Sequence, residues 1–111
     1  MPITPIEMIP AKEAETSQTT QYTANTLTAQ IILFTATNTS GSAATLSVNL
    51  VPPGGTLGDS NQIVDERSIS PGETYTFPEL AGHVIQSSGF ISTIASAAGI
   101  TIRASGVEIT S

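Results

Sequence analysis

The chain has no cysteine and no tryptophan, and only 11% of its 111 residues are charged. Without cysteine it can form neither a disulfide nor a thiolate nucleophile, which fits a cytosolic origin. About 25% of an average soluble domain is charged, so uncharged groups must cover most of this surface. Ser and Thr supply 30 of the 111 positions. Because Thr suits a pleated sheet and the strong helix formers are scarce, the composition predicts an all-β protein.

Basic residues are also few. Three Lys or Arg stand against nine Asp or Glu, which gives a formal net charge of −6. Nucleic acids and anionic membranes repel such a chain, so neither is an expected partner. No run approaches 18 apolar residues, and the N-terminal sequence lacks the basic and apolar segments of a signal peptide. We therefore expect no membrane span and no secretion signal, and synthesis in the cytoplasm of the producing cell.

The residues that most enzymes and metal sites need are scarce. His83 is the single histidine, and no Gly-x-Ser-x-Gly motif is present, so we predict no catalytic residue and no enzyme. One histidine without cysteine disfavours a zinc site. Asp59, Asp65 and Glu66 could offer oxygen atoms to calcium, but their spacing does not match an EF-hand loop. No cofactor or metal is predicted, although a cation near Asp59 to Glu66 stays an open alternative.

Residues 30–55 predict a hairpin, two strands joined by a polar turn, and the remaining chain is expected to pack against it. In the first strand, even positions form one apolar face and odd positions begin a second: Ile32, Phe34 and Ala36, then Ile31 and Leu33. The second face is either covered by another layer of the domain or exposed for contact between subunits. The second strand alternates between apolar residues and the polar Ser47 and Asn49, which is typical of a half-buried strand.

Turn residues recur at intervals of roughly eight to twelve residues in the rest of the chain, which indicates about seven or eight strands. This pattern predicts a single antiparallel β-sandwich over residues 19–111, Ig-like or jelly-roll-like, with a small barrel as the second choice. In the last strand the apolar positions change from even to odd at Ser105-Gly106. A β-bulge at that dipeptide would keep both halves facing the core.

Residues 1–18 differ from the rest because three prolines interrupt a run of apolar side chains. Proline blocks a regular helix, so this segment is predicted to be an extended N-terminal arm. The arm is either a mobile leader with one edge strand or an arm that lies on a neighbouring subunit or partner. On the second interpretation the partner-binding residues are those of the arm and of the odd-numbered face: Ile3, Ile6, Met8, Ile9, Ile31 and Leu33.

Several short segments carry a family resemblance. They are Gln21-Tyr22, Asn38-Thr39-Ser40, residues 46–52, residues 70–73 and residues 106–109. Together they resemble small virion-associated β-sandwich proteins of tailed bacteriophages, over about residues 19–111. The resemblance implies a non-enzymatic structural protein that is present in many copies in the virion. It also implies other virion proteins as partners and a homo-oligomeric state.

The resemblance leaves several positions in the virion open. A capsid decoration or cement protein that binds and stabilises the head, with the major capsid protein as its partner, is favoured because the chain is one small domain without fibre repeats. Neck, collar, tail and fibre proteins are alternatives. A carbohydrate- or host-binding β-sandwich is a further alternative, although such sites normally display several aromatic rings, and only 5% of this chain is aromatic.

Overall fold

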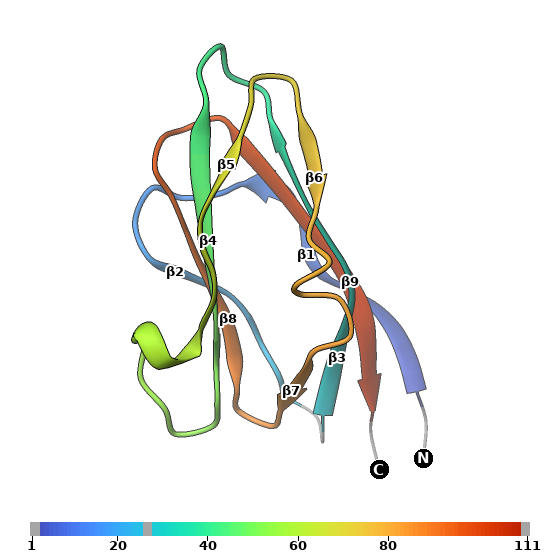
Figure 1. The fold of residues 1–111 in the computed structure, drawn as a ribbon. Helices are drawn as coiled ribbons and strands as arrows, with labels where there is room; N and C mark the ends of the chain where they lie inside the picture. Colours follow the sequence, from blue (N-terminus) through green and yellow to red (C-terminus); the bar gives the residue numbers. More distant parts are fainter. Residues whose placement is uncertain (1–2, 26–27, 110–111) are drawn as a thin grey trace.

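The computed structural model describes residues 3–25 and 28–109. These residues form nine strands and one 3₁₀ helix, and every strand pair is antiparallel (Figure 1). The elements are β1 (Ile3–Glu13), β2 (Thr19–Thr23), β3 (Thr28–Asn38), β4 (Ala44–Val51), η1 (Asp59–Asn61), β5 (Gln62–Ile69), β6 (Thr74–Thr76), β7 (Val84–Gln86), β8 (Phe90–Ala95) and β9 (Ile100–Ile109).

The strands form two layers. Sheet A has the order β1-β9-β3-β6, with β7 also paired to β3, and sheet B has the order β2-β8-β4-β5. Since β6 and β7 pair with different parts of β3, they share one edge position, and each layer is four strands wide. The chain passes repeatedly from one layer to the other, which is the jelly-roll arrangement. The prediction of an all-β antiparallel sandwich is confirmed, with the jelly-roll form of the two that were expected. The predicted hairpin over residues 30–55 is wrong, because β3 and β4 lie in different sheets and do not pair.

The hydrophobic core lies between the two sheets. Phe34 of β3 and Phe77 pack edge to face with ring centroids 5.4 Å apart, and Tyr75 packs against Phe77 at 4.7 Å. From sheet B, Leu46 and Val48 are fully buried, as the alternation of β4 predicted.

The predicted solvated side of β4 is wrong, because Ser47 and Asn49 are also buried. Ser47 accepts a hydrogen bond from the Glu66 N–H, and Asn49 donates to the Gly58 carbonyl and to Asn61 Oδ1. No buried side-chain nitrogen or oxygen of the described residues lacks a hydrogen bond. The core is therefore apolar, and the buried polar side-chain atoms of the described residues all form hydrogen bonds.

The N-terminal segment differs from the expected arm. Residues 3–13 form β1, which pairs along its length with β9 of the same chain, from Ile3 opposite Ile109 to Glu13 opposite Thr101. Met8 and Ile9 are buried in the core. The physical reason is that β9 offers an open edge, and burial of these side chains there removes apolar surface from water. The structure thus places residues 3–13 inside the sandwich rather than in a separate arm.

The expected irregularity near Ser105-Gly106 lies on the neighbouring strands and not on β9. The even positions of β9 face inward as far as Gly106. Opposite Gly106, β3 gains one residue between Ile31 and Leu33, and β1 gains one between Ile6 and Ile9. Both neighbours of β9 therefore bulge at the same level, and β9 continues in register.

These bulges change the direction of side chains in β3. Ile31 faces the core and Phe34 faces the core, whereas Ile32 and Leu33 between them are 52% and 45% exposed. Without the bulge, alternation would turn one of this pair inward. The jelly roll therefore displays two consecutive large apolar side chains on its outer surface.

Candidate functional site: the outer face of sheet A

The six side chains that the sequence predicted to bind a partner lie in different environments. Ile3 is 64% exposed and Leu33 is 45% exposed. Ile6 is partly buried and packs against the core. The other three are buried within the chain itself: Met8, Ile9 and Ile31. In this structure those three pack in the core and are not available to a partner, because the bulges direct them between the sheets.

The strand register brings further apolar residues beside Ile3 and Leu33. Residues directly opposite each other in neighbouring strands share one face of a sheet. One row across sheet A consists of Ile3, Ile109, Thr28 and Gln86, and the next consists of Pro5, Val107, Gln30 and Val84. Val84 is 55% exposed. We define the apolar face as Ile3, Pro5, Ile32, Leu33, Val84, Val107 and Ile109.

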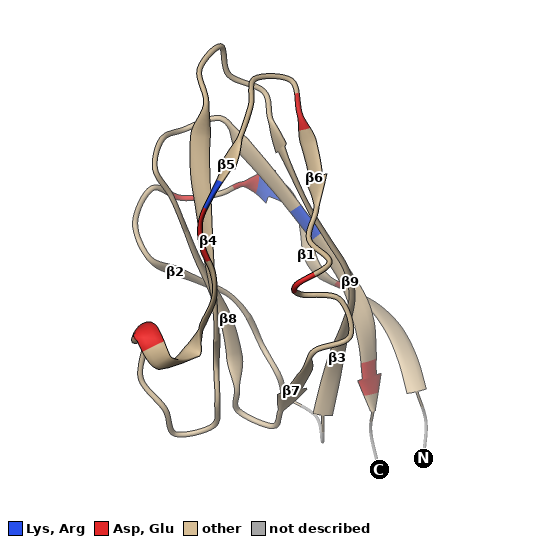
Figure 2. Cartoon of the chain, in the orientation of Figure 1, with Lys and Arg blue, Asp and Glu red and all other residues tan. Residues whose placement is uncertain are grey.

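No charged residue interrupts the apolar face. The stretches 3–6, 28–35, 84–86 and 104–107 contain none, and Figure 2 shows the lower parts of β1, β3 and β7 without charge. The carboxylate of Glu108 accepts a hydrogen bond of 2.5 Å from the Tyr22 hydroxyl of sheet B. Burial, with this carboxylate as a second cause, raises the pKa of Tyr22 well above its ordinary value. Glu108 is thus engaged by the opposite sheet.

An ion pair borders the apolar face where the charged part of sheet A begins. Arg103 Nη2 donates to Glu7 Oε2 at 2.6 Å, and both side chains are about half exposed. The pair joins neighbouring strands and holds two opposite charges side by side. It therefore presents little net charge to an approaching molecule. The border is therefore polar without being strongly acidic or basic.

A small notch adjoins the apolar face at one end of the sandwich. Its cavity of about 110 Å³ lies where the end of β4 approaches β7. The lining residues are Leu50, Val51, Pro52, Pro53, Val84, Ile85 and Gln86. Val84 belongs to both the notch and the apolar face, so the two regions meet at this residue, and the uncharged Gln30 lies between Val84 and Val107.

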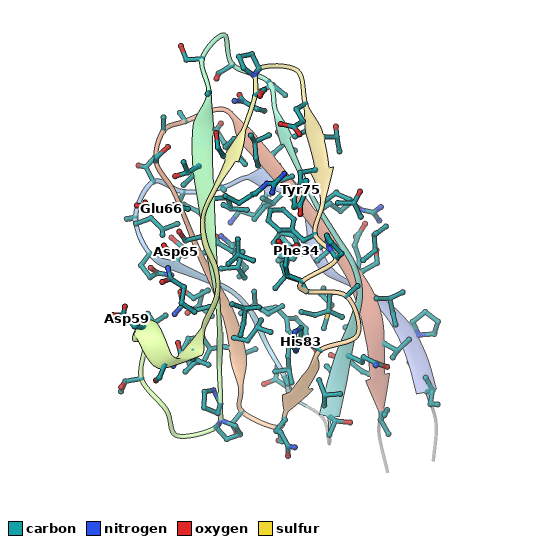
Figure 3. The ribbon with its side chains drawn as sticks, viewed as in Figure 1. Phe34, Asp59, Asp65, Glu66, Tyr75 and His83 are labelled. Carbon is teal, nitrogen blue, oxygen red and sulfur yellow. The ribbon has the colours of Figure 1, made fainter. Side chains whose placement is uncertain are left out.

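The acidic residues of the predicted loop lie on the other layer. Figure 3 shows Asp59 on η1 and Asp65 and Glu66 on β5, directed away from Phe34 in the core. Among residues 3–25 and 28–109, no group of three His, Cys, Asp or Glu side chains is placed to hold a metal ion. His83 is exposed, and its backbone carbonyl accepts a hydrogen bond from the Ile31 N–H at 2.9 Å.

No helix in the described ranges is both long and apolar enough to cross a membrane.

Comparison with known proteins gives a likeness of fold. No family model matches the chain, and no curated protein matches it. The chain is similar to one in a solved structure titled "Structure of infectious bursal disease virus Gx strain", with a TM-score of 0.53 and 11% sequence identity. The match covers 96% of this chain and 31% of that one, so the chain spans about a third of the viral protein's length. At this identity the likeness concerns the fold, which is that of a β-domain found in a virus structure.

Sequence reasoning missed most of the apolar face. Alternation in β3 grouped Ile32 with Phe34, and the bulge separates them. The position of Val84 beside Gln30 depends on the pairing of β7 with β3, which no local pattern indicates. The sequence contained one signal of this face. The apolar residues of the last strand change from even to odd positions between Ile102 and Val107, and in the structure Val107 and Ile109 lie on the outer face.

Proposed function

We propose that this chain is a structural protein of a bacteriophage virion, a decoration or cement protein that binds the major capsid protein on the assembled head. It would be made in the host cytoplasm and bound in many copies. Two findings support a virion role in general: the jelly-roll topology, which recurs in viral capsid domains, and the likeness to a domain of a virus structure. Because a fold does not determine function, the proposal depends on the surface.

The observation that carries the proposal is the apolar face. Soluble monomers rarely expose a continuous apolar patch, and such patches usually mark protein–protein contacts. Here Ile3, Ile32 and Val84 are each more than half exposed on one uncharged side of sheet A. A protein surface that covers this side would remove their apolar area from water without burying an unpaired charge.

The edges of the sheets are poorer candidates for contact. The outer strand β1 contains Pro5 and Pro10, which lack an N–H donor, and its register is irregular. One outer strand of sheet B, β5, is irregular between Val64 and Arg67 and carries consecutive charges. Such features oppose the addition of a further strand at β1 or β5. Contact through the face of sheet A is therefore favoured over extension of a sheet at these two edges.

The proposal is tested by adding purified protein to phage heads and, separately, to tails, both from particles that lack this protein. We expect saturable co-sedimentation with heads. Leu33→Lys should abolish this binding, because it places a charge in the apolar face. Thr23→Lys, which adds the same charge at an exposed position of β2, should bind like the native chain. Binding to tails and not to heads would overturn the head assignment.

A further inference from the structure

The notch beside the apolar face has the size of one side chain. Sites for small-molecule ligands usually measure about 300–1,000 Å³, whereas the notch holds about 110 Å³. An apolar cavity of about 150 Å³ is large enough for benzene. Carbon atoms of Leu50, Val51 and the two prolines line most of the notch. Its dimensions and lining thus fit an aliphatic side chain rather than a free metabolite.

The walls of the notch are held in place by the backbone. The Gly55 N–H donates to the Pro52 carbonyl at 2.9 Å, which closes the turn after β4. Gly89 lies so close to the opposite wall that a Cβ there would be 3.0 Å from the carbonyl oxygens of both Val51 and Gln86. The end of β4 and the β7–β8 turn are therefore in direct contact. A preformed notch costs an incoming side chain little ordering of the site.

The charges of this chain indicate which kind of partner surface would supply the side chain that enters the notch. All three Lys and Arg side chains already have internal partners: Lys12 with Glu15 at 2.8 Å, Arg103 with Glu7 at 2.6 Å, and Arg67 over the Tyr75 ring at 3.8 Å. Since the net charge is −6, a second copy of the chain would be repelled as it approached. A basic partner surface would be attracted, because long-range charge steers association, and a neutral one would not be repelled.

We propose that the notch receives one aliphatic side chain from a neutral or basic protein surface, the same surface that covers the apolar face. This inference rests on the proposed function, because the partner is the head protein proposed above. Val84 connects the two regions, so one partner can contact both at once. The inserted side chain would act as the anchor of the contact, and the apolar face around it would exclude water.

The first test uses the isolated protein and benzene as the probe. Methyl NMR spectra of the native chain are recorded during a benzene titration. We expect saturable shifts for the methyl groups of Val51, Val84 and Ile85, and none for those of Ile63 on β5. Val84→Asp, a change at an exposed position, should remove the shifts while the protein stays folded. Shifts that are absent, or equal across the molecule, would overturn the notch as a binding site.

The second test measures affinity for heads that lack the protein. Val84→Asp should weaken binding by about tenfold or more, whereas Ile63→Asp, the same change on the exposed part of β5, should not. Binding of the native chain should not strengthen as ionic strength rises. Salt screens the attraction of a basic surface to the acidic chain and leaves contact with a neutral surface unchanged. Stronger binding at high salt would contradict the assigned charge of the partner.

The outcomes separate this inference from the proposed function. If the native chain does not bind heads, the proposed function fails. If it binds heads and Val84→Asp binds equally well, the notch assignment fails while the proposed function stands. Sedimentation velocity of the native chain provides a further check, because a dimer that Val84→Asp dissociates would show that a second copy is the occupant and overturn the inference.

Discussion

Gly106 and Met8 are packed so closely that a Cβ on Gly106 would lie 2.6 Å from Met8 Sδ. The same atom would lie 2.3 Å from the carbonyl oxygen of Gln30. A Cβ atom essentially never has contacts this short, so β1 and β3 can approach β9 here only because residue 106 has no side chain. This approach coincides with the two bulges and with the outward display of Ile32 and Leu33.

We predict that Gly106→Ala lowers the free energy of unfolding by about 1–3 kcal/mol, since the backbone of β3 and the Met8 side chain must move. Urea denaturation measures the change. Gly41→Ala is the matched control, because a Cβ at Gly41 meets nothing within 4 Å. Equal stability of the two variants would show that the strands separate here without cost.

A second prediction concerns Glu66, which adopts a left-handed φ of 51° in the irregular part of β5. Its N–H donates to Ser47 Oγ at 2.9 Å, which holds the bulge against β4. The left-handed conformation costs a residue with a side chain about 1–2 kcal/mol, and glycine avoids this cost but loses more chain entropy on folding. Glu66→Gly should therefore raise stability by about 0.5–1 kcal/mol.

The neighbouring Asp65 supplies the control for this prediction, because it has no left-handed φ. Asp65→Gly should lower stability by about 0.5–1 kcal/mol, as glycine does inside a strand. Thermal unfolding of both variants tests the pair. Stabilisation by both changes, or by neither, would show that backbone conformation is not the cause.

A third prediction concerns Asn38, which is fully buried at the end of β3. Its side-chain amide donates to the carbonyls of Ser42 and Ile69 at 2.8 and 2.9 Å, and its Oδ1 accepts bonds from the backbone N–H and the hydroxyl of Ser40. Asn38→Ala leaves these groups without partners, so we expect a loss of about 3 kcal/mol in chemical denaturation.

Thr39→Ala provides the comparison in the same loop. Thr39 donates to the Gly99 carbonyl at 3.1 Å, but this bond is exposed, and water can replace it. Its removal should change stability by about 0.5 kcal/mol or less. Comparable losses for Asn38→Ala and Thr39→Ala would contradict the role of Asn38 as the centre of a buried network.

The sequence predicted the inward side of β4 correctly, since Leu46 and Val48 lie in the core. Its prediction of a solvated opposite side was wrong, because Ser47 and Asn49 are buried by contacts with Glu66, Gly58 and Asn61. The sequence was misleading where the direction or burial of a side chain depends on a strand that is distant in sequence. Asn38 reads as an ordinary turn residue, and its burial depends on Ile69 of β5. The outward direction of Ile32 depends on the bulge opposite Gly106, far away in sequence.

The same distinction holds for the candidate site. Ile3 and Leu33 could be selected because they are apolar residues in segments that looked unusual. The notch could not be found from the sequence, since it exists only where the end of β4 approaches β7. The two strands are connected by more than thirty residues of intervening chain, and no local pattern records their contact.

The last prediction concerns the pH dependence of stability. Hydrogen bonds from Lys12 Nζ at 2.8 Å and Gln21 Nε2 at 2.9 Å lower the pKa of Glu15 from 4.5 to about 2. A carboxylate with a lowered folded-state pKa stabilises the protein above its ordinary pKa, and this contribution disappears as pH falls from about 4.5 to about 2. The group is exposed, so the effect should be small and weaker at high salt.

Glu15→Gln stays neutral at every pH, so it cannot lose this contribution. The urea midpoint of the native chain should therefore fall more than that of Glu15→Gln between about pH 5 and about pH 2.5, and the two curves should converge in acid. Asp59→Asn is the control for the loss of one acidic side chain, because among the described residues the Asp59 side chain forms no hydrogen bond and no ion pair. Parallel curves for the native chain and Glu15→Gln would show that the Lys12 and Gln21 bonds do not favour the charged carboxylate in solution.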